Sequence, residues 1–122
     1  MSILKSLTML NENTIKLVFY DNITIDLDGM KEGLKQLDDF TQNRRLKKLV
    51  VVGKKTGITR EARKFGHTEI KARGKYTIAE AMVVHTLTQK MIANFYFAFV
   101  KNMYPVKYFT DIKEAKEWLK AI

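Results

Sequence analysis

The run LKKLVVVG, from Leu46 to Gly53, decides the fold. A short and mostly apolar run that ends at a glycine is typical of a strand buried on both faces of a sheet. Such a strand has neighbours along both edges and helices over its faces. We therefore expect a central strand here, and we assign the rest of the chain outward from it.

Two alternating segments precede this strand. Thr14 to Tyr20 and Ile23 to Leu27 are rich in β-branched and aromatic residues and alternate with period two, which is typical of strands. Asp21 and Asn22 separate the two segments, and both residue types tolerate the positive φ of a tight turn. We therefore predict a hairpin across Asp21-Asn22, with a further strand over residues 3 to 10.

One helix is expected before the central strand in the sequence and another after it. Asp28 can cap the first, which is predicted to run to about Asn43. Its apolar residues recur at the spacing of one helical face, at Met30, Leu34, Leu37 and Phe40. Thr59 is expected to cap the second, a short helix that ends near Gly66.

The segment from about Tyr76 to His85 carries two conflicting signals. Thr77 and Glu80 have the T-x-x-E spacing of a capping box, which favours the start of a helix. The residues around and after Glu80 form an apolar run rich in β-branched residues, which favours a strand. We predict a strand.

The last third of the chain is predicted to fold as helix, strand and helix. Thr86 or Thr88 caps a helix through about Lys101, and Pro105 ends it before the short strand PVKYF. Asp111 then caps an amphipathic helix, in which Trp118 and Leu119 are expected to seal the core.

These elements define an α/β fold in one domain, residues 1–122. The expected architecture is a single mixed β-sheet with an N-terminal antiparallel hairpin followed by βαβαβα, with the helices packed on the sheet. The composition, 46% apolar with no cysteine, indicates a packed core without disulfides. No signal peptide or transmembrane segment is visible, so we expect a cytoplasmic protein without transmembrane insertion.

The net charge of +9 is concentrated in one segment. Residues 54 to 76 contain eight Lys and Arg against two Asp and Glu. Such a cluster attracts anions, including phosphates, nucleic acid and acidic lipid, although a solvated surface that keeps the protein soluble explains it equally well. The candidate anion-binding residues are Arg60, Arg63, Lys64, Lys71, Arg73 and Lys75.

The sequence contains no arrangement that specifies a reaction or a cofactor. Gly53 and Gly57 lack the spacing of a phosphate-binding loop. His67 and His85 lack the further ligands that zinc requires, so His67 is expected to be solvated and His85 to be structural. We therefore expect no metal, no cofactor and no catalytic residue, and hence a protein that is not an enzyme.

The helix predicted from about Leu87 to Lys101 is apolar on nearly every side. Met91, Ile92, Phe95, Phe99 and Val100 share one face, while Tyr96 and Phe97 spread onto its neighbours. Ordinary core packing remains one explanation. The other is that a second helix, a ligand or another copy of the chain covers this surface. Its candidate residues are Met91, Phe95, Tyr96, Phe97 and Phe99.

Three segments of the second half resemble the STAS/SpoIIAA-like family of small α/β domains. They are LVVVG at Leu49 to Gly53, LTQKMIANFYFAF at Leu87 to Phe99, and PVKYFTDIKEAKEWLKAI at Pro105 to Ile122. The family is related in fold to anti-sigma-factor antagonists and CRAL-TRIO domains. The resemblance implies a binding or regulatory role without catalysis, which some members exert through phosphorylation of a serine.

The stretch that would correspond to the phosphorylated motif departs from the family. It reads GKKTGITREA, with Thr56 and Thr59 but no Asp-Ser pair, so the resemblance does not carry the phosphorylation switch to this chain.

Two hypotheses for function follow. The first is a non-enzymatic module that acts through the apolar surface or a crevice around the Leu87 to Val100 helix. Its partner is then another protein, a second copy in a homodimer, or a lipid-like molecule. The alternative is an anion or nucleic-acid binder that acts through the basic segment, although no recognised RNA- or DNA-reading motif accompanies those residues.

Overall fold

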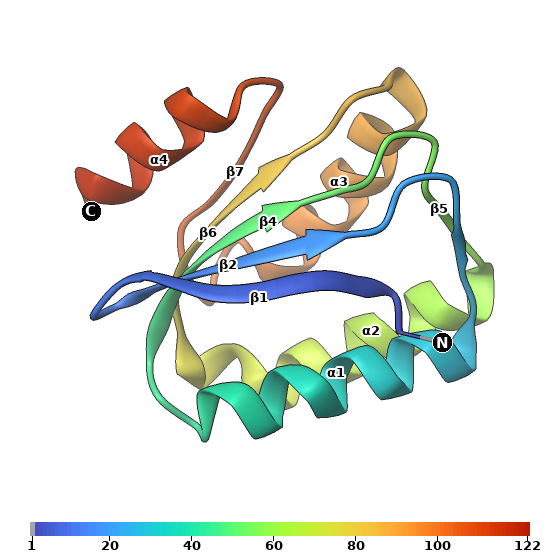
Figure 1. Cartoon of the computed structure of the whole chain (residues 1–122), viewed down its shortest axis with the longest axis horizontal. Coiled ribbons are helices and arrows are strands. Elements are labelled where there is room, and N and C mark those ends of the chain that lie inside the picture. Colours follow the sequence, from blue (N-terminus) through green and yellow to red (C-terminus); the bar gives the residue numbers. More distant parts are fainter. Residues whose placement is uncertain (1) are drawn as a thin grey trace.

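The computed structural model describes residues 2–122, which form one mixed sheet with helices on both faces (Figure 1). The strand order is β1-β2-β4-β6-β7. β1 and β2 are antiparallel, and the other neighbours are parallel. The predicted mixed sheet is confirmed, with the Leu46 strand at its centre. The strands are β1 Leu4–Asn11, β2 Thr14–Phe19, β4 Leu46–Val51, β6 Thr77–Val83 and β7 Val106–Phe109.

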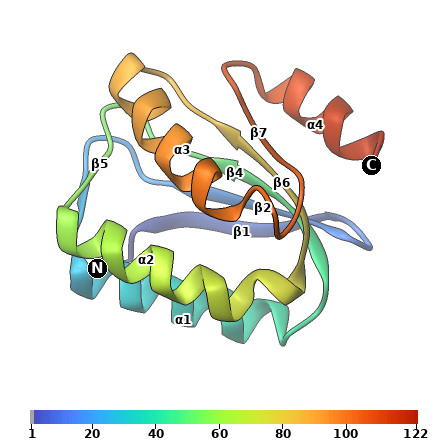
Figure 2. The ribbon, with the colours of Figure 1, turned by 180° about the vertical axis from the view of Figure 1, so that it is seen from behind.

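The helices form two layers around the sheet. The helices α1 and α2 lie side by side over one face, and α4 covers the opposite face (Figures 1 and 2). The third helix, α3, packs beside α2 and against β7. The successive parallel connections step across the sheet in one direction, and right-handed crossovers then place their helices on one face. The bounds are α1 Leu27–Thr41, α2 Arg60–Arg73, α3 Leu87–Val100 and α4 Ile112–Lys120, with a 3-10 turn, η1, at Gly74–Tyr76.

The position of the hairpin differs from the prediction. β2 pairs with β1, whereas the Ile23 segment forms a short strand, β3 (Thr24–Ile25), that pairs in parallel with β5 (Gly57–Ile58). Asn22 does adopt a positive φ of 57°. Asp21 and Asn22, however, bond to Lys54 instead of closing a hairpin, because Lys54 N–H donates to Asp21 and Asn22 N–H donates to the Lys54 carbonyl.

Two predicted helix boundaries are wrong. α1 begins two residues earlier than expected, because Asp26 and not Asp28 accepts the Gly29 N–H as the N-cap. α2 does not stop near Gly66 but continues to Arg73. Gly66 keeps an ordinary helical backbone and brings α2 close to Met30 of α1. The contacts with α1 offset the roughly 1 kcal/mol that a glycine costs inside a helix.

The strand predicted over Ile23 to Leu27 is limited to Thr24–Ile25, because Leu27 already begins α1, whereas most other predicted boundaries agree with the structure. β6 is a strand, as its apolar run indicated. Thr59, Thr86 and Asp111 are the N-caps of α2, α3 and α4, and each side chain accepts a backbone N–H of its helix. The central strand ends at Val51, and Gly53 follows two residues later at a position where a Cβ would collide with the Tyr20 carbonyl.

The two faces of the sheet have separate cores. Ala79, Ala81 and Val83 of β6 pack under α4 with Ala115 and Leu119. The other cluster lies on the α1 and α2 side and includes Ile15, Leu17, Leu46 and Val50. Trp118 is half-buried and packs against Phe109 with ring centroids 5.9 Å apart. None of the helices in residues 2–122 combines the length and the apolar character that crossing a membrane requires.

Candidate ligand cavity

The structure forms a partly open cavity of about 230 Å³ between the sheet and the helices α1, α2 and α3. Its walls are predominantly apolar. A cavity of about 150 Å³ lined by apolar side chains already admits a molecule as large as benzene. The apolar lining comes from β2, β4, β6 and the three helices, and includes Leu17, Phe19, Met30, Leu34, Leu37, Val50, Ile58, Ile70, Met82, Val84 and Ile92.

Alternation along the strands places specific side chains in this cavity. Glu80, Met82 and Val84 point toward it, while the residues between them pack under α4. Small residues on the opposing helices, Gly66 of α2 and Ala93 of α3, also line it. The space between helices and sheet therefore stays partly unfilled where a larger side chain would close it.

A hydrogen-bonded cluster lies in one wall of the cavity. The Tyr96 hydroxyl donates to Glu80 Oε1 at 3.0 Å and lies 2.9 Å from the Tyr104 hydroxyl. Burial raises the pKa of the Glu80 carboxyl, and the neighbouring Lys48 opposes this shift. Burial likewise raises the pKa of Tyr96, so both tyrosines remain hydrogen-bond donors at neutral pH.

Lys48 lies beside Glu80 and lines the same cavity. Burial lowers the pKa of its ammonium, and the Glu80 carboxylate partly restores it. Among residues 2–122 no carboxylate lies within ion-pair distance of Lys48 Nζ. The cavity therefore contains an acid and a base whose charges are coupled but not in contact.

Arg63 and His67 line the cavity from α2. The His67 ring stacks on Phe99 with centroids 5.0 Å apart. Burial and then the nearby Arg63 charge lower the pKa of His67, so the ring is neutral at neutral pH. The expectation of a solvated His67 is wrong, because the longer α2 turns this residue toward α3. Arg63 Nε is buried and has no hydrogen-bond partner within residues 2–122.

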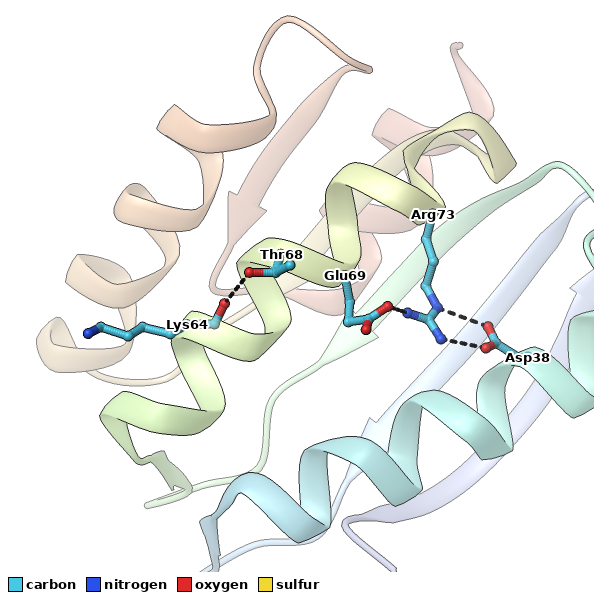
Figure 3. Close-up of polar contacts among 5 residues, drawn as sticks. All are labelled: Asp38, Lys64, Thr68, Glu69 and Arg73. Atoms are coloured by element: carbon cyan, nitrogen blue, oxygen red, sulfur yellow. Dashed lines mark hydrogen bonds and ion pairs between the residues drawn. The ribbon is translucent and has the colours of Figure 1, made fainter.

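Arg73, in contrast, is fully engaged. Its guanidinium contacts both carboxylate oxygens of Asp38 on α1, at 3.1 and 2.5 Å, and also contacts Glu69 one turn earlier on α2 (Figure 3). These bonds raise the pKa of Arg73, chiefly through Asp38. The ion pairs link α1 to α2 at the end of the cavity where Arg73 lies.

The predicted anion-binding residues do not form one cluster. Arg63 faces the cavity and Arg73 is held by carboxylates. Arg60, Lys64, Lys71 and Lys75 are exposed. Lys64 points away from α1 (Figure 3), and the Lys71 ammonium lies 5.0 Å from the centroid of the Phe99 ring on α3.

The predicted apolar surface divides into two parts. Met91 and Phe95 are 55% and 67% exposed, and Phe99 is also exposed. Tyr96 instead lines the cavity, and Phe97 stacks on Tyr108. Leu87, 74% exposed, was not predicted as part of the surface but extends it by one turn. We call Leu87, Met91, Phe95 and Phe99 the exposed stripe.

His85 has the structural contact that the sequence suggested, since its Nε2 lies 2.7 Å from the Val52 carbonyl oxygen. The two threonines near the missing phosphorylation motif are both engaged. Thr56 is buried and its hydroxyl donates to the Tyr20 carbonyl. The Thr59 hydroxyl accepts the Ala62 N–H as the α2 cap.

Sequence reasoning missed Lys48, Glu80 and Tyr104. Lys48 and Glu80 are charged residues inside runs that are otherwise largely apolar. A charged residue at an inward-facing position of a buried strand is itself a signal of a polar site, because its burial is costly. Tyr104 has no comparable signal, since it follows α3 in a turn.

A mixed sheet with this order and these helix layers defines the SpoIIAA-like fold. The structure matches an uncharacterised protein of the DUF3478 family with a SpoIIAA-like fold from Shewanella loihica PV-4. The TM-score is 0.68 at 14% sequence identity, over 93% of this chain and 90% of that one. The predicted SpoIIAA-like fold is thereby confirmed.

The family follows from the sequence itself. The model of DUF7793, a domain of unknown function, matches residues 8–122, and the chain belongs to this family. No curated protein sequence matches the chain.

Proposed function

We propose that this protein is a non-catalytic binding module that holds a small apolar or amphipathic, lipid-like molecule in its cavity. The observation that carries the proposal is the cavity of about 230 Å³ with apolar walls and a few convergent polar groups. Sites for small molecules have this composition, in which the walls supply affinity and the polar groups supply orientation.

The polar groups support a ligand that is amphipathic. An empty polar cluster in an apolar wall is costly unless its groups are bonded. Glu80, Tyr96 and Tyr104 bond to one another, whereas Lys48 and Arg63 also line the cavity and Arg63 Nε has no hydrogen-bond partner among the described residues. A ligand with one polar end satisfies such donors and fills the apolar space with the rest of its length.

Native mass spectrometry of protein purified from cells tests the proposal, together with displacement of a fluorescent apolar probe by medium-chain alcohols and acids. We expect a retained small molecule or saturable displacement. An Ala93→Phe variant should fill the cavity and weaken probe binding about tenfold or more, because Ala93 lines it. Ala98→Phe, on the exposed side of the same helix, is the matched control and should bind like the wild type. Equal binding by a folded Ala93→Phe protein would contradict the proposal.

We propose as a second candidate function that the exposed stripe on α3 docks onto an acidic lipid surface. The stripe combines large apolar side chains with basic neighbours. α3 contains no acidic residue, and Lys71 of α2 reaches its Phe99. An apolar helix face flanked by lysines is typical of helices that lie in a membrane interface. A second copy fits less well, because a two-fold contact would bring like charges together.

Sedimentation with vesicles tests this second function. We expect binding to vesicles containing phosphatidylserine, little binding to pure phosphatidylcholine, and weakening with salt. Met91→Ser with Phe95→Ser should abolish binding. Leu10→Ser with Phe40→Ser, which changes exposed apolar residues elsewhere, should not. Binding of nucleic acid in place of vesicles, or a dimer that the stripe variant dissociates, would refute membrane docking and favour those partners.

A further inference from the structure

We propose that the cavity selects carboxylic acids, and that the guanidinium of Arg63 pairs with the carboxylate of an otherwise apolar ligand. This inference rests on the proposed function and names the class of molecule. It starts from a contrast between two arginines on α2. Arg73 contacts the carboxylates of Asp38 and Glu69, whereas Arg63 Nε is buried without a hydrogen-bond partner among the described residues.

An arginine cannot relieve burial by losing its proton, because the guanidinium stays charged in proteins. A buried donor without a partner therefore carries a desolvation cost for as long as the site is empty. An anionic ligand removes that cost.

The charged groups around the cavity also favour an anionic ligand. The ionisable lining of the cavity consists of Lys48, Arg63, His67, Arg73, Glu80, Tyr96 and Tyr104. Asp38 and Glu69 compensate Arg73, and Glu80 faces Lys48 across the strand pair. His67 is neutral, and the tyrosines keep their protons. Arg63 is therefore the arginine of the lining that has no carboxylate partner among the described residues.

One guanidinium without a carboxylate partner fits a carboxylate better than a phosphate monoester. A phosphate monoester carries about −1.5 to −2 at neutral pH, whereas a carboxylate carries one charge. The guanidinium fork matches the two oxygens of a carboxylate, and pairing in an apolar surrounding strengthens each bond. His67, one helical turn from Arg63 and in the same lining, offers a further hydrogen bond to the head group.

The test compares octanoate with 1-octanol, which share a chain length and differ in charge. Both displace the fluorescent probe from the wild type, and octanoate should bind about tenfold more tightly or better. Arg63→Met should abolish that preference while 1-octanol binds as before. Arg60→Met removes the same charge from an exposed position of α2 and should retain the preference.

The outcomes separate the two proposals. Equal binding of acid and alcohol by the wild type would overturn the selection for acids and leave the cavity's function standing. Binding of neither compound would overturn both. Loss of the preference in Lys48→Met but not in Arg63→Met would also refute the assignment, since the carboxylate would then pair with Lys48.

A second measurement needs no variant and so does not depend on Arg63→Met folding. Octanoate labelled with carbon-13 at the carboxyl group reports its own titration by NMR. Pairing with Arg63 favours the ionised form, so the bound carboxyl should titrate at lower pH than the free acid. A bound carboxyl that titrates at higher pH, as simple burial would cause, contradicts the pairing.

Discussion

Lys48 and Glu80 are direct neighbours across the parallel strands β4 and β6, and both side chains lie on the face that α1, α2 and α3 cover. The two charges are strongly desolvated, and each opposes the effect of burial on the pKa of the other. Removing one of them leaves the other without its counterion. Removing both takes the two charges out of the wall and leaves the Tyr96 and Tyr104 hydroxyls bonded to each other.

This relationship predicts a difference between single and double variants. Lys48→Met should lower the free energy of unfolding, but by less than the about 3 to 5 kcal/mol that breaking a buried contact ion pair costs, because the two groups are coupled without touching. Lys48→Met combined with Glu80→Leu should cost clearly less than the single change. Urea denaturation measures both. A double variant as unstable as the sum of its single changes would show that the two charges are not coupled.

The burial of Leu119 allows a prediction of how much α4 contributes to the stability of the core. Leu119 is 2% exposed between α4 and the sheet, so Leu119→Ala should cost about 2 to 5 kcal/mol. Leu87→Ala makes the same change on the exposed stripe and should alter stability by about 0.5 kcal/mol or less. Thermal unfolding of the pair measures this, and equal melting temperatures would mean that α4 does not seal the sheet.

The lowered pKa of His67 predicts that the stability of the protein depends on pH. The pKa of His67 in the folded protein lies below the ordinary value of 6.5, so below that pH the unfolded chain binds more protons than the folded one. The free energy of unfolding should therefore fall as the pH drops through 6.5, and the contribution is fully present above it. Denaturation of the wild type and His67→Gln at about pH 7.5 and about pH 5.5 isolates this contribution.

The expected result is a smaller loss of stability at the lower pH in His67→Gln than in the wild type. Leu87→Ala, which leaves both histidines in place, is the control and should lose as much as the wild type. Identical losses in the wild type and His67→Gln would show that the ring is freely protonated in the folded protein.

Much of the fold could be predicted because local signals agreed with tertiary packing. The apolar run at Leu46 and the caps at Thr59, Thr86 and Asp111 depend on neighbouring residues alone, and the structure confirms all of them. The hairpin was misplaced because the Asp21-Asn22 turn bonds to Lys54, about thirty residues away. Gly66 was misread as a helix end because its packing against Met30 is not visible in the sequence.

The candidate site was less predictable. Helical spacing indicated that α3 is too apolar for one buried face; in the structure Met91 and Phe95 are exposed, while Tyr96, which was expected to lie off the shared apolar face, lines the cavity. Spacing could not show that Tyr96 turns toward Glu80, because that contact joins α3 to a strand. The cavity depends on where small residues, such as Gly66 of α2 and Ala93 of α3, leave space between the helices and the sheet. No local pattern encodes an absence of contact.

Substitution of Tyr96 tests how much the polar cluster contributes to the free energy of unfolding. The Tyr96 hydroxyl donates to the buried Glu80 and approaches the Tyr104 hydroxyl, so Tyr96→Phe leaves polar groups unpaired without changing the volume of the ring. The expected cost is about 1 to 3 kcal/mol in the free energy of unfolding, since the unpaired carboxyl bears its full desolvation penalty. Burial already favours the protonated form of Glu80, and loss of this donor should raise the pKa of its carboxyl further.

Tyr108→Phe, which removes a hydroxyl from the β7 tyrosine that stacks on Phe97, is the matched control and should cost less. Urea denaturation at neutral pH measures both variants, and a Tyr96→Phe protein as stable as Tyr108→Phe would show that the cluster does not depend on this hydroxyl.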